Sequence, residues 1–93
     1  MSPRDRRAAR WADLRVADVV VVLGEVDHAR GEHLGPADRA RLGESLWRIV
    51  RKRQMLSTRD VRTEAARISA TSVSAAYAAE VVSRLKRLVV AHP

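Results

Sequence analysis

Four side chains able to bind a metal ion or a proton lie close together around Gly31. The stretch DHARGEH contains Asp27, His28, Glu32 and His33. Carboxylate and imidazole groups are ligands for divalent metals. The two histidines, however, are five residues apart across a glycine, and the chain has no cysteine to complete a familiar site. We therefore predict no metal here, but a solvated helix end whose histidines lie near the negative pole of the helix dipole.

The serines give no sign of a nucleophilic site. A catalytic serine needs a base beside it and a third group that orients the base. No histidine lies close in sequence to the candidate serines at positions 45, 57, 69, 72, 74 and 83. Gly24 stands alone, and no Lys followed by Ser or Thr comes after the Gly31–Gly35 segment, so a phosphate-binding loop is absent as well. We expect no enzymatic activity, no cofactor and no small-molecule substrate.

Positive charge is the strongest chemical signal in the chain. The formal net charge is +7, and sixteen of the eighteen cations are arginine. At helical spacing, one arc of the segment that contains RIVRKR carries Arg41, Arg48, Arg51 and Lys52. Because guanidinium groups bind phosphate through paired hydrogen bonds, this arc predicts contacts with an anionic partner such as nucleic acid. The alternative is an ordinary solvated helix face on a small basic domain.

Length and composition restrict the class of protein. Ninety-three residues suffice for one domain, and the lack of cysteine fits a reducing compartment. No apolar run approaches the ~18 residues that cross a bilayer. Asp5, Asp13 and Asp18 interrupt the N-terminal stretch that otherwise resembles a signal peptide. We expect a single-domain cytoplasmic protein with no membrane partner.

The run of four valines at 19–22 is compatible with a strand or a helix. A strand would have almost nothing to pair with, because the only other strand-like run is Leu88–Val90. As a helix over Arg4–Ala29, the segment gathers one apolar arc, made of Trp11, Ala12, Val16, Val19, Val22, Leu23 and Val26. Leu14 and Val21 would share the far side of this helix and could form a dimer contact. We predict a helix.

Three further helices follow from the local signals. Pro36 suits the first turn of the second helix, and Ser57 with Asp60 resembles a capping box at the start of the third. The stretch SATSVS, residues 69–74, predicts a tight turn with Thr71 or Ser72 capping the fourth helix. A single kinked helix is the alternative, because neither Gly nor Pro enforces the break.

The last two helices could also form a helix-turn-helix. In that motif the second helix enters the major groove of DNA. Thr71, Ser72 and Ser74 would then face base edges, and three arginines would be available for phosphates, namely Arg59, Arg62 and Arg67. The turn glycine of the motif is missing, and Ala75 and Ala79 offer no hydrogen bonds to bases. A plain helical hairpin of a bundle is the alternative.

The sequence thus predicts an all-α compact bundle of about four helices. We expect a small protein that binds nucleic acid, double-stranded DNA in the first place, mainly through phosphate contacts. The alternative is a protein–protein interaction module, such as an adaptor, an antitoxin-like protein or an assembly subunit. That module would pair with itself or with another helix through the strip of Leu14 and Val21 or the alanine-lined side at Ala75 and Ala79.

Overall fold

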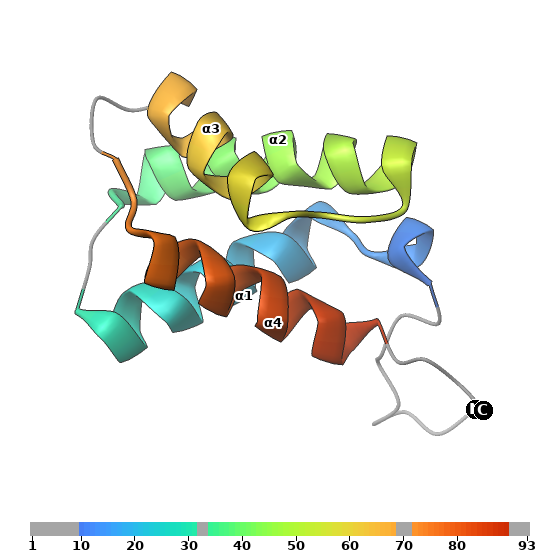
Figure 1. The fold of residues 1–93 in the computed structure, drawn as a ribbon, viewed down its shortest axis with the longest axis horizontal. Helices are drawn as coiled ribbons and strands as arrows, with labels where there is room; N and C mark the ends of the chain where they lie inside the picture. Colours follow the sequence, from blue (N-terminus) through green and yellow to red (C-terminus); the bar gives the residue numbers. More distant parts are fainter. Residues whose placement is uncertain (1–9, 32–33, 69–71, 90–93) are drawn as a thin grey trace.

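The valine run is helical. The computed structural model describes residues 10–31, 34–68 and 72–89. These residues form a 3-10 turn, η1, at Trp11–Asp13 and the four helices α1 at Val16–Arg30, α2 at Pro36–Arg53, α3 at Thr58–Ile68 and α4 at Ala75–Leu88 (Figure 1). No β-strand occurs in the described ranges. The predicted all-α bundle of about four helices is confirmed.

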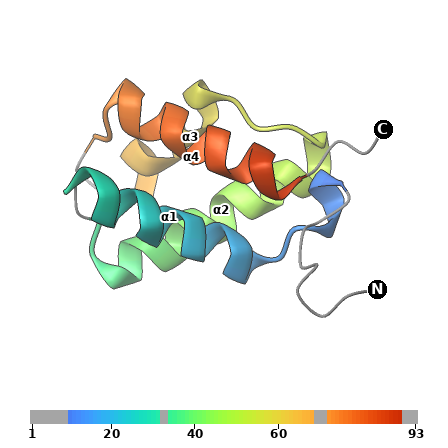
Figure 2. The same cartoon turned by 90° about the horizontal axis from the view of Figure 1, so that it is seen from below.

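The helices surround one core in the order of the sequence. α1 packs against α2 and α4, and α3 packs against the same two helices, whereas the described residues show no comparable contact between α1 and α3 or between α2 and α4. Figure 1 shows α2 and α3 along the upper side, and Figure 2 shows α1 and α4 next to each other when the bundle is seen from below. The bundle therefore has two opposite sides, the α2–α3 side and the α1–α4 side.

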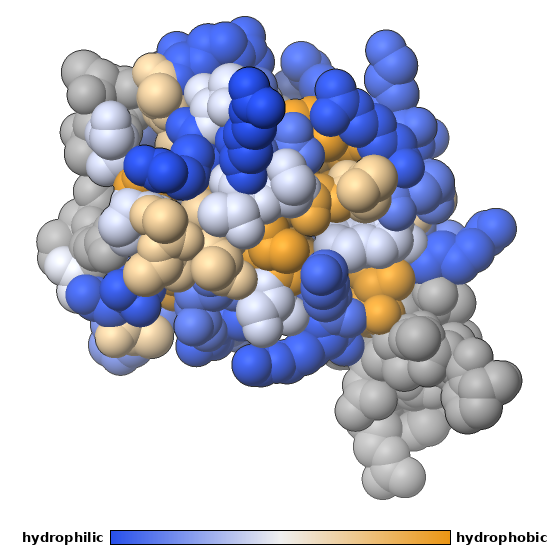
Figure 3. Space-filling view, viewed as in Figure 1, coloured by the Kyte–Doolittle hydropathy of each residue, from blue (hydrophilic) through white to orange (hydrophobic). Residues whose placement is uncertain are grey.

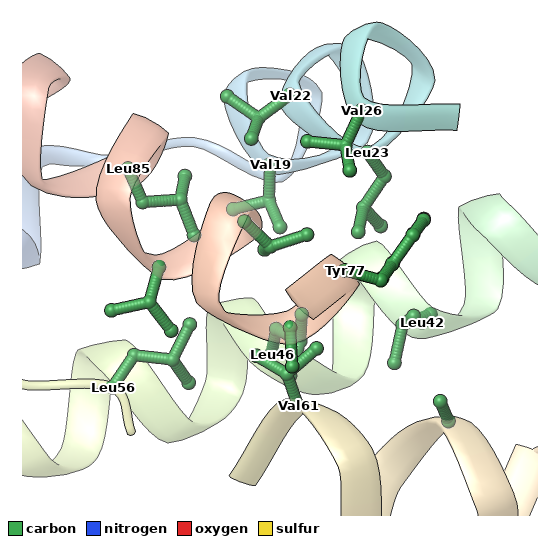
Figure 4. Close-up of a cluster of buried hydrophobic side chains, with 14 of the residues drawn as sticks. Val19, Val22, Leu23, Val26, Leu42, Leu46, Leu56, Val61, Tyr77 and Leu85 are labelled. Atoms are coloured by element: carbon green, nitrogen blue, oxygen red, sulfur yellow. The ribbon is translucent and has the colours of Figure 1, made fainter. Parts of the chain in front are cut away.

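Aliphatic side chains from every helix fill the core, as a chain without Phe requires. Figure 4 shows side chains of all four helices pointing toward a common centre, with Val61 of α3 and Leu46 of α2 among them. Each Val or Leu that is fully buried contributes about 1.5–3 kcal/mol relative to an exposed one. Tyr77 is completely buried, whereas Trp47 is only half-buried at the edge of the core.

Most helix ends follow the local signals. Gly31 ends α1 in the left-handed conformation that favours glycine, with a φ of 65°. Pro36 occupies the first turn of α2. Ser57 and Asp60 form the predicted capping box before α3, because the amide of Asp60 donates to Ser57 Oγ at 3.1 Å and the amide of Ser57 donates to Asp60 Oδ2 at 3.0 Å.

The predicted start of the first helix is wrong where it can be checked. Residues 4–9 lie outside the described ranges, but Trp11–Asp13 form the 3-10 turn and α1 begins only at Val16. The amide of Arg15 donates to Asp18 Oδ2 at 2.8 Å, which caps α1 at this point. The indole Nε1 of Trp47 donates to the carbonyl of Leu14 at 2.8 Å and holds the extended link against α2. The hydrogen bond between Trp47 and Leu14 thus stabilises an extended link where the sequence predicted a turn of helix.

The third and fourth helices are separate. α3 ends at Ile68 and α4 begins at Ala75, which excludes the single kinked helix. The cap of α4 is Ser74, whose Oγ accepts from the amide of Tyr77 at 3.0 Å. Ser72 is therefore not the cap, and Thr71 lies outside the described residues. The helix starts later than predicted: Val73 is buried and lies outside the helix, and Ser74 has an extended backbone with a φ of −70° and a ψ of 160°.

Candidate functional site

Positive charge is concentrated on the α2–α3 side. Between Pro36 and Ile68 the chain has nine cations and four carboxylates, a formal charge of +5 out of the total of +7. α1, by contrast, has three carboxylates and one arginine, a formal charge of −2. The summed field of the protein therefore attracts anions toward α2 and α3.

The predicted arc of α2 is exposed but partly neutralised. All four of its members reach solvent, namely Arg41, Arg48, Arg51 and Lys52. Arg41 lies 3.8 Å from Asp38, Arg48 forms an ion pair with Glu44, and Arg51 stacks over the ring of Trp47 with 4.9 Å to the centroid. Among these four, Lys52 is without a partner in the described part of the chain. Exposed pairs of this kind are weak and exchangeable, but they reduce the charge available to a ligand.

A small groove between α2 and α3 also contains arginines whose charge is balanced. About 220 Å³ in volume, it is lined by Arg41, Glu44, Ser45, Arg48, Arg67 and Ile68. Arg67 and the hydroxyl of Ser45 both donate to Glu64 Oε1. The hydrogen bonds from Arg67 and Ser45 hold the pKa of the Glu64 carboxyl below its ordinary value. Glu64 therefore stays ionised and occupies these donors.

On its other face, α3 borders a second groove that has cations and no carboxylate among the described residues lining it. This groove, the α3 groove, has a volume of about 530 Å³ and lies between α3 and the chain that leads into α4; its lining is Thr58, Arg59, Arg62, Thr63, Ala66, Ser72 and Val73. Arg59 is exposed and makes no ion pair within the described ranges. Arg62 Nε donates to the carbonyl of Val73 at 3.4 Å, which leaves its terminal nitrogens for a ligand.

The predicted nucleic-acid residues thus separate into two groups. The α3 groove brings together Arg59, Arg62 and Ser72. Of the α2 arc, Arg41 and Arg48 line the small groove between α2 and α3 together with Glu44, whereas Arg51 and Lys52 line neither groove. Ser74 lines neither groove, and its hydroxyl accepts a helix-capping hydrogen bond. Figure 3 shows the face formed by α3 and α4, with strongly hydrophilic residues gathered over α3 and paler residues over the first half of α4.

The predicted pairing of Leu14 with Val21 is wrong. Leu14 is 3% exposed and belongs to the core, whereas Val21 is 58% exposed on α1. A spacing of seven residues puts two side chains on one face only within a continuous helix, and the helix begins after Leu14. On α4, Ala75 and Ala79 are exposed, as expected for the alanine-lined side.

Sequence reasoning missed a buried polar network. Asp27 is 3% exposed, the hydroxyl of Tyr77 donates to its Oδ1, and Arg39 Nε donates to its Oδ2 at 3.1 Å. The sequence does indicate that Asp27 is buried, because it follows Leu23 by four residues and therefore lies on the same apolar arc of α1. Both carboxylate oxygens of Asp27 accept hydrogen bonds from these donors, so Asp27 has a structural role in the core. His28 is exposed, and Glu32 and His33 lie outside the described residues.

No group of three or more metal-binding side chains occurs in the described ranges. Nor does any helix described there have the length and apolarity that crossing a membrane requires. Comparison with known protein families, with curated proteins and with solved structures finds no significant match to this chain.

Proposed function

We propose that this protein binds nucleic acid, double-stranded DNA in the first place, through phosphate contacts centred on the α3 groove. The observation that carries the proposal is the composition of this groove: Arg59 and Arg62 line it together with three hydroxyl groups, and none of the described lining residues is a carboxylate. Arginine and hydroxyl side chains are the usual partners of phosphate oxygens.

The arrangement of the donors supports a phosphate ligand. Arg59 and Arg62 are three residues apart on α3, so their side chains leave the same face of the helix about 5–6 Å apart at Cβ. Thr58 and Thr63 flank them on α3, and Ser72 comes from the opposite wall. On α2, Lys52 is exposed and the ion pairs of Arg41 and Arg48 are weak, so these cations add to the positive field of the α2–α3 side.

A duplex is favoured over a single strand because the described residues offer few aromatic faces. Single-strand binding depends on stacking of bases on exposed rings. Tyr77 is buried in the core, and the ring of half-buried Trp47 is covered on one side by Arg51. We therefore propose binding led by phosphates, with little sequence preference, by a regulator or accessory protein that acts on DNA in the cytoplasm.

Insertion of α4 into the major groove is not part of this proposal. Six residues, 69–74, separate α3 from α4, whereas the helix-turn-helix has a turn of three or four residues. The first turn of α4 presents Ala75 and Ala76 to solvent, and neither has a hydrogen-bonding side chain. The hairpin is instead proposed to hold the two walls of the α3 groove.

A salt series with a random DNA duplex tests the proposal. If about five phosphates are neutralised, the logarithm of the affinity falls with the logarithm of the salt concentration with a slope near −4.5. Replacing Arg59 and Arg62 together by Gln is expected to flatten this slope by about 2 and to weaken binding. Circular dichroism melting checks that the variant stays folded.

The matched control removes the same charge elsewhere. Arg10→Gln with Lys86→Gln also lowers the net charge by two, at two exposed positions outside the α3 groove. We expect the control to keep most of the slope. Equal losses in both variants would mean that net charge alone drives binding, and the assignment to the α3 groove would be wrong. Absence of binding at low salt would remove the whole proposal.

A further inference from the structure

The α1–α4 side contains a groove with an apolar floor and charged walls. Its volume is about 290 Å³, and it is lined by Asp18, Val21, Val22, Glu25, Arg84, Arg87 and Leu88. Val21 is 58% exposed here, and it is one of two large hydrophobic side chains that are exposed among the described residues. Figure 2 shows α1 and α4 lying side by side on this side of the bundle. We call this surface the α1–α4 groove.

The charges of this groove are ordered by helix. Both acidic members, Asp18 and Glu25, come from α1, and both basic members, Arg84 and Arg87, come from α4. Their sum is zero, on a chain whose formal charge is +7. A second copy of the protein can therefore approach this groove without the repulsion that it would meet at the basic α2–α3 side.

Not every charged side chain of the groove forms an ion pair or a hydrogen bond with the described residues of its own chain. Arg84 Nε donates to Glu80 at 2.8 Å, and Arg84 Nη1 lies 3.4 Å from Glu25. Asp18 accepts from the amide of Arg15 through Oδ2. Arg87, in contrast, has no ion pair among the described residues and lines the groove beside the half-buried Leu88. An acidic group placed over α4 would therefore find a free cation.

The two helices run in opposite directions. Glu25 of α1 meets Arg84 of α4, whereas two residues further along α1, Asp27 meets Tyr77, which precedes Arg84. A twofold axis parallel to the helices would place α1 of one copy over α4 of the other at the same height. Asp18 and Glu25 of one copy would then lie over Arg87 and Arg84 of its partner. A twofold axis across the helices would set acid over acid, which is unfavourable.

From this arrangement we infer that the protein forms a symmetric dimer through the α1–α4 groove, with the exposed Val21 and the half-buried Leu88 of both copies between the charged walls. Such a contact is isologous, because each copy supplies the same acidic and basic halves. It leaves the α3 groove exposed on both copies, and it goes beyond the proposed function without depending on it.

The size of the surface predicts a weak dimer. Fifteen residues of α1 span about 22 Å, and two adjacent helices each about 10 Å wide give a face of about 450 Å² per copy. Stable interfaces bury about 800 Å² per partner. We therefore expect dissociation in the micromolar to millimolar range, where sedimentation velocity at concentrations from about 10 μM to 1 mM separates monomer from dimer.

Two exposed apolar side chains provide a matched pair of variants. Val21 and Met55 are both 58% exposed, but Met55 lies in the link between α2 and α3. We expect Val21→Arg to raise the dissociation constant at least tenfold, because it sets a cation over the basic wall of the partner, and Met55→Arg to leave it unchanged. Arg87→Glu is expected to act like Val21→Arg, because it sets a carboxylate over the acidic wall of the partner. Circular dichroism melting verifies the fold of each variant.

The results separate this inference from the proposed function. A protein that stays monomeric up to the highest concentration, or a dimer that survives Val21→Arg and Arg87→Glu, would overturn the inference. So would a dimer that Met55→Arg disrupts, because the contact would then lie elsewhere. The Arg59→Gln, Arg62→Gln variant is expected to dimerise normally, and Val21→Arg, studied at dilute concentration, is expected to keep the salt dependence of DNA binding.

Discussion

The hydroxyl of Tyr77 on α4 donates a hydrogen bond to the carboxylate of Asp27 on α1, and both side chains are buried. Arg39 of α2 donates to the second oxygen of the same carboxylate at 3.1 Å. One buried acid thus joins three of the four helices. A buried carboxylate is tolerated only when its oxygens have donors, so this network also fixes how α1, α2 and α4 face one another.

Replacing Tyr77 by Phe removes one donor and keeps the ring in the core. We expect a loss of about 1–3 kcal/mol in the free energy of unfolding, because one oxygen of the buried carboxylate is left without a partner. Urea denaturation measures it. In an Asp27→Asn background the same substitution is expected to cost less, since the hydrogen bond to a charged group is already gone. An unchanged midpoint in the single variant would show that Asp27 does not depend on the hydroxyl.

Val20 of α1 packs closely against Gly43 of α2. A Cβ atom on Gly43 would lie 2.5 Å from Val20 Cγ2 and 3.4 Å from the backbone nitrogen of Val20. Val20 is β-branched and has little rotamer freedom in a helix, so we expect Gly43→Ala to destabilise the protein by about 1–3 kcal/mol through overpacking. Thermal denaturation measures the loss.

Gly24 is the control for that substitution. A Cβ atom there would meet only the side chain of Arg39, at 3.8 Å, which is ordinary contact. Because alanine favours a helix interior over glycine, Gly24→Ala is expected to stabilise the protein by about 0.5–1 kcal/mol. Two glycine-to-alanine changes in neighbouring helices should therefore have opposite signs. The same sign for both would contradict the packing described for α1 and α2.

Ser74 and Ser72 test where α4 begins. Ser74→Ala removes the hydroxyl that accepts from the amide of Tyr77, so we expect a loss of about 1 kcal/mol. Ser72 is exposed and is not the cap of α4, and Ser72→Ala is expected to change stability by less than about 0.5 kcal/mol. Chemical denaturation of the two variants side by side distinguishes these positions. The reverse order would return the cap to the position that the sequence predicted.

Acid should weaken the contact between α2 and α3. Hydrogen bonds from Arg67 and Ser45 lower the pKa of the Glu64 carboxyl from its ordinary value of 4.5. A carboxyl whose pKa is lower in the folded than in the unfolded state stabilises the fold above the unfolded value, and this stability is lost as the pH falls through the folded pKa. We therefore expect the urea concentration at the denaturation midpoint to decrease once the pH falls below about 4.5.

The variant Glu64→Gln separates this carboxylate from the other acids. We expect Glu64→Gln to be less stable than the unmodified protein at neutral pH, because Arg67 loses its charged partner. The difference between the two proteins should shrink as the pH falls below the folded pKa of Glu64. A difference that stays constant with pH would mean that Glu64 acts through packing rather than charge.

The helices and their buried faces were predictable because they depend on the spacing of residues that are close together in the sequence. The spacing of Val19, Leu23 and Val26 along α1 predicted their burial, and the cap at Ser57 and Asp60 needs only neighbouring residues. The start of α1 was not predictable in this way. Leu14 and Trp47 are 33 positions apart, and the hydrogen bond between them competes with a helical turn that the local sequence permits.

By itself the sequence determined the fold class and placed the positive charge on the segments that became α2 and α3, because periodicity fixes which residues share a face of a helix. Periodicity does not fix which face meets which neighbour. Packing brought Glu64 to Ser45 and Arg67, and Asp27 to Tyr77 and Arg39. Packing also left Arg59 and Arg62 in a groove without a described carboxylate, and it exposed Val21 between walls of opposite charge. Neutralisation of a charge depends on distances of a few ångströms between separate helices, and only the tertiary structure sets these.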